Sequence, residues 1–99
     1  MTDVPELLQG TLSPKEIQDL ATDLQSIAEL QSVIVKRGAE SRAKPDEVPL
    51  QEALDELQAG TVTGVQIRYA FQDRDWCDTL IREGEAIRVI RMDVTAPDR

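Results

Sequence analysis

The chain has 99 residues, of which 40% are hydrophobic and 30% charged, and its formal net charge is −8. This length predicts a single domain, residues 1–99, with one modest core, and the composition is typical of a soluble globular protein. The chain has no histidine and one cysteine, Cys77, which excludes histidine-based catalytic arrangements, intrachain disulfides and multi-cysteine metal sites.

No apolar run is long enough to span a bilayer, and the first ten residues have no basic residue of the kind that opens a secretory signal. We therefore expect a cytoplasmic protein. Residues 1–60 carry twelve acids and five bases, whereas residues 61–99 carry seven acids and six bases, all of them arginine. The acidic first part should repel nucleic acids and anionic membranes, so neither is expected as a partner.

Residues 1–12 are expected to form a loosely held lead-in, with Leu7 and Leu8 docked on the core. A helix is predicted over 14–37, because Ser13 and Glu16 have the spacing of a capping box. Apolar residues then recur at three- and four-residue spacing: Ile17, Leu20, Ala21, Leu24, Ile27, Ala28, Leu30, Val33 and Ile34. A short sheet cannot cover so long a stripe, so its surplus part is expected to contact a second helix or another subunit.

Residues 38–47 are predicted to be a loop, and a second helix is predicted from about Pro49 to Ala59, ended by Gly60. Residues 13–60 would thus form the helical part of the domain.

Residues 61–93 are typical of a three-stranded antiparallel meander. The first strand alternates apolar and polar residues from Val65 to Phe71. Turns at Asp73–Arg74 and Glu83–Gly84 would lead into strands at Asp75–Arg82 and Ala86–Met92, and residues 94–99 would be a tail. The predicted fold is α+β with the order ααβββ and both helices on one sheet face.

These turns define a register and hence two faces. One face is the expected core, which includes all three aromatic residues: Val65, Ile67, Tyr69, Phe71, Trp76, Leu80, Ile87 and Val89. Asp78 would also point inward, where a hydrogen bond to Tyr69 or a pairing with Arg91 would satisfy it. The second face mixes polar and apolar side chains: Gln66, Arg68, Ala70, Cys77, Thr79, Ile81, Arg88, Ile90 and Met92.

Two patterns on the strands suggest chemistry. Arg68, Thr79 and Arg88 are predicted to lie side by side on the second face, where they would suit a carboxylate or phosphate. Asp73, Asp75 and Asp78 have part of the spacing of a calcium loop, but the glycine and the final glutamate of that loop are missing. Neither a metal nor a cofactor is expected.

The chain therefore favours a small non-catalytic interaction domain, an accessory or regulatory subunit that binds a protein partner or forms a homodimer. The candidate interaction surface comprises Arg68, Thr79, Ile81, Arg88, Ile90, Met92, Leu30 and Val33. An alternative is a module that binds small anions through the sheet arginines. A third interpretation is a histidine-free enzyme with Asp78 and Tyr69 as acid and base.

Overall fold

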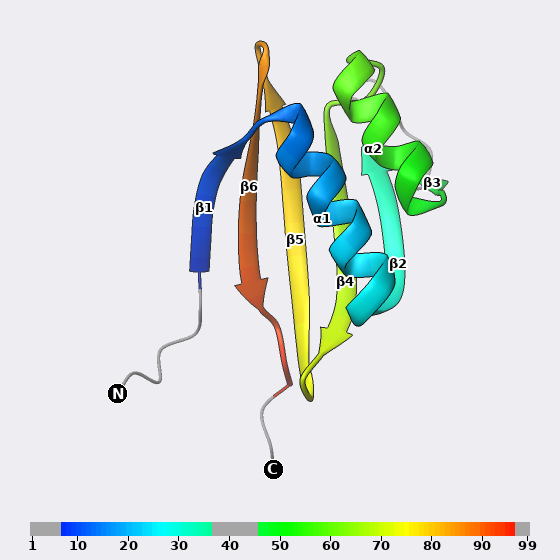
Figure 1. Ribbon diagram of the computed structural model, residues 1–99, viewed down its shortest axis with the longest axis vertical. Helices are drawn as coiled ribbons and strands as arrows, with labels where there is room; N and C mark the ends of the chain where they lie inside the picture. The colour runs from blue at the N-terminus through cyan, green and yellow to red at the C-terminus, as the bar shows by residue number, and fades with distance from the viewer. Residues whose placement is uncertain (1–6, 37–45, 97–99) are drawn as a thin grey trace.

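The computed structural model describes residues 7–36 and 46–96. Their elements are β1 (Leu7–Leu12), α1 (Pro14–Ile27), β2 (Glu29–Lys36), β3 (Asp46–Glu47), α2 (Leu50–Ala59), β4 (Gly64–Phe71), β5 (Arg74–Glu83) and β6 (Ala86–Asp93) (Figure 1). All strands join one antiparallel sheet in the order β1-β6-β5-β4-β2-β3, in which β3 contributes only two residues. The α+β class is confirmed, whereas the order ααβββ is wrong because the helices are interleaved with strands.

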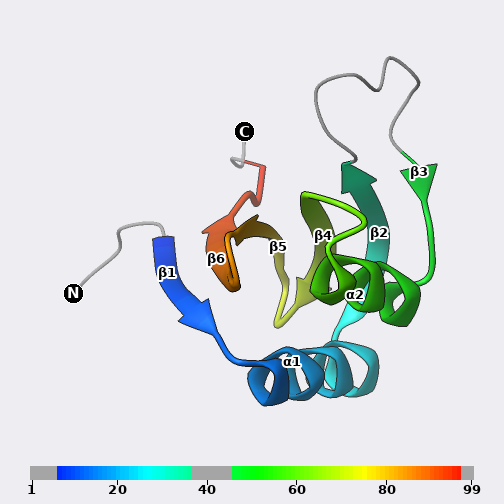
Figure 2. The ribbon, with the colours of Figure 1, turned by 90° about the horizontal axis from the view of Figure 1, so that it is seen from above.

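Both helices lie on the same side of the sheet (Figure 2), which we call its front face. The core lies between the helices and β2, β4 and β5. Among the described residues, no helix combines the length and the hydropathy that crossing a membrane requires.

Helix α1 begins as predicted and ends early. The Ser13 hydroxyl accepts a hydrogen bond from the Glu16 amide at 3.2 Å, and the Glu16 carboxylate accepts one from the Ser13 amide at 2.8 Å. The helix ends at Ile27, because Ala28 takes an extended conformation with φ −111° and ψ 159°. The predicted helix end at Arg37 is therefore wrong.

Residues Glu29–Lys36 form β2, not the end of a helix. The consecutive residues Val33, Ile34 and Val35 are β-branched, which favours a strand. Val33 and Val35 face the core opposite Ile67 and Val65, whereas Ile34 points to the other side. The apolar residues of this segment therefore alternate between the two sides of a strand, as in β2, and do not line one side of a helix. The surplus apolar face that was predicted for the end of this helix does not exist.

The predicted lead-in is corrected over Leu7–Leu12, which pairs along its full length with β6. Residues 1–6 and most of the predicted loop 38–47 lie outside the described residues, but Asp46 and Glu47 of that loop pair with Val35 and Ile34 as β3. Helix α2 is close to its prediction. Its end is at Gly60, whose φ of 86° is a left-handed conformation that glycine adopts without strain.

Both hairpin turns lie one residue away from their predicted positions. The β4–β5 turn is Gln72–Asp73, and both residues have the positive φ of a type I′ turn. The β5–β6 turn is Gly84–Glu85. Each change moves the strand pairing by two residues, so that Leu80 lies opposite Val89 instead of Ile87. Because side chains alternate with a period of two, the predicted faces are nevertheless correct.

Candidate functional site

The first candidate surface is the face of the sheet opposite the helices, which we call the back face. The strand register assigns to it Ser32, Ile34, Gln66, Arg68, Cys77, Thr79, Ile81, Arg88, Ile90 and Met92. Neither α1 nor α2, the two helices of the described residues, covers this face (Figure 2). Its isoleucines are half-buried among their neighbours, and Met92 is 47% exposed.

Six of the eight residues predicted for the interaction surface lie on the back face, and two do not. Val33 is only 5% exposed and packs in the core opposite Ile67. Leu30 lies opposite Tyr69, on the front side, and is 37% exposed. Both were assigned to the last part of the predicted helix, which is β2 in the structure, so they do not join the other six.

The predicted side-by-side row of Arg68, Thr79 and Arg88 is wrong. Arg68 lies opposite Cys77 and Arg88 opposite Ile81, so the three residues follow a diagonal across the strands. From strand spacing and rise, the two arginine backbones lie roughly 16 Å apart. Arg88 also pairs with Glu83 at 2.9 Å. The anion-binding alternative therefore loses the geometry that motivated it.

The charges of the back face are balanced and separated along the strands. Glu29 and Asp75 flank Ala70 at one end of the sheet, and Lys36 and Arg88 lie at the other end. With Arg68 and the Arg88 partner Glu83, the described side chains of this face include three bases and three acids. The described charges of this face therefore balance, although the chain as a whole has a net charge of −8.

Cys77 lies between Arg68 and Met92 on the back face and is buried. The aspartates of the calcium-like pattern do not converge. Asp75 points to the back, whereas Asp78 points to the front, and the described residues contain no cluster suited to a metal ion.

A buried polar cluster on the front face confirms the prediction for Asp78. Its side chain is 0% exposed and accepts a hydrogen bond from the Tyr69 hydroxyl at 3.1 Å. Arg91 binds both carboxylate oxygens, through Nε at 2.9 Å and Nη2 at 2.8 Å. Burial and the charge of Asp78 raise the pKa of Tyr69 well above its ordinary value, and the hydrogen bond to Asp78 raises the pKa of Arg91. We call these three residues the Asp78 cluster.

The second candidate surface is a groove on the front side between α1 and the strands β1 and β6. Figure 1 shows these two strands beside α1 instead of beneath it. The groove has a volume of about 330 Å³ and is lined by Gly10, Leu12, Glu16, Asp19, Leu20, Asp23, Val89 and Arg91. It adjoins a hollow of about 130 Å³ that shares Leu20, Asp23 and Arg91 and reaches Ile27 and Phe71.

Sequence reasoning missed this groove because it took residues 1–12 as a lead-in. The available signal was Gly10, a glycine inside a short run that otherwise suits a strand. Glycine in a strand interior often marks a place where another group approaches the backbone closely.

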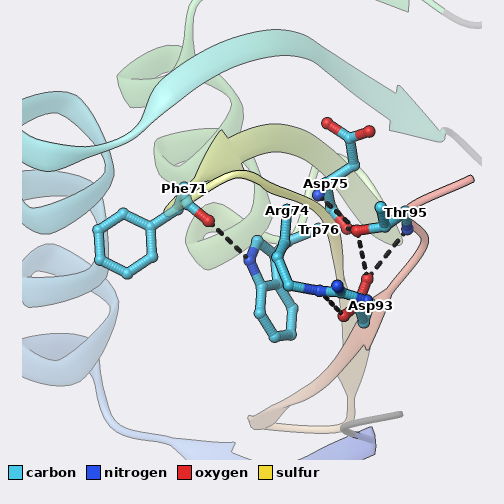
Figure 3. Close-up of polar contacts among 6 residues, drawn as sticks. All are labelled: Phe71, Arg74, Asp75, Trp76, Asp93 and Thr95. Carbon is cyan, nitrogen blue, oxygen red and sulfur yellow. Dashed lines mark hydrogen bonds and ion pairs between the residues drawn. The ribbon is translucent and has the colours of Figure 1, made fainter.

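A third set of polar contacts has a structural role (Figure 3). Asp93 accepts hydrogen bonds from Arg74 and from the hydroxyl and amide of Thr95, and Thr95 in turn accepts one from the Asp75 amide. These bonds, those from Thr95 first and Arg74 next, lower the pKa of Asp93 to about 2. With the hydrogen bond from the Val94 amide to the Asp75 carbonyl, they hold the start of the predicted tail against the first residues of β5.

Comparisons of the chain with protein-family models, with curated proteins and with solved structures give no match. The back face and the groove are therefore the features from which we infer a function.

Proposed function

We propose that this chain is a small non-catalytic interaction domain, an accessory or regulatory subunit, and that it forms a homodimer through the back face. The observation that carries the proposal is the aliphatic centre of a sheet face that neither helix covers. Water-facing positions of an antiparallel sheet are normally polar. Here Ile34, Ile81 and Ile90 occupy such positions.

Burial of these isoleucines supplies the driving force for association. Complete burial of such a side chain is worth about 1.5–3 kcal/mol, so covering the exposed part of a half-buried one contributes about 1 kcal/mol. Met92, which is 47% exposed, adds a flexible side chain that adapts to the opposite surface.

The charge pattern favours a second copy of this chain as the partner. Two chains of net charge −8 repel one another through most of their surfaces, but the described charges of the back face balance. A twofold axis in the plane of the interface and perpendicular to the strands would reverse one sheet relative to the other. The acidic end of each sheet would then face the basic end of its mate, with Glu29 opposite Lys36.

The size of the back face is adequate for a dimer. The sheet has five longer strands, β1, β6, β5, β4 and β2. With strands about 4.8 Å apart and seven residues of about 3.3 Å rise along each, its flat outline covers roughly 550 Å². This flat outline is smaller than the about 800 Å² per partner of a standard interface, and the side chains that stand on the sheet add accessible area to it.

Sedimentation equilibrium over a concentration series tests the proposal. We expect the native chain to dimerise and the variant Ile90→Glu to be monomeric, because a charge would be buried at the centre of the interface. The matched control is Ile27→Glu, which alters an isoleucine that is 61% exposed on α1, away from the back face. It should dimerise like the native chain. A native chain that stays monomeric at high micromolar concentration would refute the proposal.

A charge exchange tests the orientation. Lys36→Glu alone should weaken the dimer by roughly two- to fivefold, as expected for exposed ion pairs. The double variant Glu29→Lys/Lys36→Glu should recover the native dissociation constant. If the double variant dimerises as weakly as the single one, Glu29 and Lys36 do not face each other across the interface.

A further inference from the structure

We propose that the groove between α1 and β1–β6 binds an extended peptide segment of a partner protein, one in which apolar and basic side chains alternate. This site lies on the opposite side of the sheet from the back face, so it is separate from the dimer surface and does not depend on it.

Gly10 gives the groove its depth. It lies on β1 opposite Val89, where a Cβ atom would meet no other atom within 4 Å. Leu12, Leu20 and Val89 supply apolar side chains around this space. An apolar side chain of a bound segment could therefore enter where the strand has none of its own.

The charges of the groove favour a cationic segment. Glu16, Asp19 and Asp23 are spaced by three and four residues, so they lie along one side of α1. Within the described part of the chain, Asp19 pairs with the exposed Lys15 at 3.2 Å, and Asp23 has no partner. The charge of Arg91 is already balanced by Asp78. The groove is thus net negative, and basic side chains complement it.

The length of the groove favours an extended peptide. The groove and the hollow that adjoins it extend along α1 from Glu16 to Ile27. Over these residues the helix rises by about 16 Å, which matches about five residues of extended chain. Arg91 uses Nε and Nη2 to bind Asp78, and its Nη1 has no hydrogen bond within the described residues. The N–H groups of Nη1 can therefore donate hydrogen bonds to a carbonyl oxygen of the bound segment.

Isothermal titration calorimetry with synthetic peptides tests the proposal. The probe is a hexapeptide of alternating leucine and arginine with both ends blocked, and its counterpart replaces each arginine by glutamate. We expect the arginine peptide to bind at one site per chain and the glutamate peptide not to bind. The same result in the Ile90→Glu variant would show that binding is independent of the back face.

Three variants locate the site. Gly10→Leu should abolish binding, because its side chain fills the groove; its unfolding temperature should not fall, since leucine suits a strand better than glycine does. Asp23→Asn should weaken binding by about threefold. The matched control is Asp55→Asn, which removes one exposed charge from α2 and should leave binding unchanged.

Three results would overturn the proposal. The first is that Gly10→Leu binds the arginine peptide as tightly as the native chain does. The second is that Asp23→Asn and Asp55→Asn weaken peptide binding equally. The third is that the arginine peptide does not bind the native chain. The second of these would mean that the peptide is attracted only by the overall charge.

Discussion

Replacing Arg91 by methionine should expose the energetic role of the Asp78 cluster. Methionine keeps an apolar stem of similar length and removes the guanidinium group. Asp78, which is 0% exposed, would then keep only the Tyr69 hydroxyl as a side-chain hydrogen-bond donor. The substitution therefore leaves a carboxylate in the core without its counter-charge.

The expected loss of stability follows from this burial. Removing one partner of a buried ion pair costs about 3–5 kcal/mol, because the remaining charge is uncompensated. Arg91 itself is 33% exposed on its side chain, so water can partly replace it. We therefore expect a cost near the lower limit, about 3 kcal/mol. This is a large part of the 5–15 kcal/mol by which domains are typically stable.

Urea unfolding, followed by the fluorescence of the single tryptophan and by circular dichroism, measures this cost. Native and variant chains are compared at one fixed concentration, because the stability of a dimer depends on concentration. The two probes should coincide, and the dependence of the free energy on urea should not change.

A triple variant is the control. Tyr69→Phe/Asp78→Leu/Arg91→Met removes all three polar groups together, so no buried group is left without a partner. Its stability should lie within about 1 kcal/mol of that of the native chain or exceed it. The reasoning would be refuted if Arg91→Met alone cost less than about 1 kcal/mol, since the pair would then not compensate a buried charge.

Three further predictions concern single groups. The pKa of Tyr69 is raised, so above pH 10 the unfolded chain loses a proton that the folded chain keeps. Stability should then fall as pH rises, and the tyrosinate absorbance should appear only on unfolding; a smooth titration of the folded chain would contradict this. The pKa of Asp93 is lowered from 3.8 to about 2, so its contribution is complete above pH 3.8 and lost as pH falls towards 2. Asp93→Asn should flatten that part of the urea-measured stability profile, and an unchanged acid slope would contradict the assigned hydrogen bonds. Finally, Ser13→Ala should cost about 1 kcal/mol in urea unfolding, through loss of the α1 cap. The control Ser26→Ala, on the exposed side of the same helix, should have no effect, and equal losses would exclude capping as the cause.

Local signals were sufficient for about half of the fold. The capping box at Ser13 identified the start of α1, and Gly60 identified the end of α2. The alternation of β4 predicted a strand, and its pairing with β5 is local because only a two-residue turn separates them. Both turn errors moved the register by two residues, so the faces and most of the back-face residues were still correct.

Distant pairing decided the remainder. Leu7–Leu12 has only a weak alternating pattern and becomes a strand because β6, far away in the chain, offers it a free edge. Residues 29–36 fit a helical as well as a strand spacing, and pairing with β4 selects the strand. The groove needs β1 and α1 to lie beside β6, so neither Gly10 nor Asp23 could be recognised as a site residue. Capping, amphipathic periodicity and tight turns are properties of neighbouring residues and can be read along the chain. Sheet order and the hollow beside α1 depend on which distant segments bury their backbone and apolar groups together, and that is settled only when the whole chain folds.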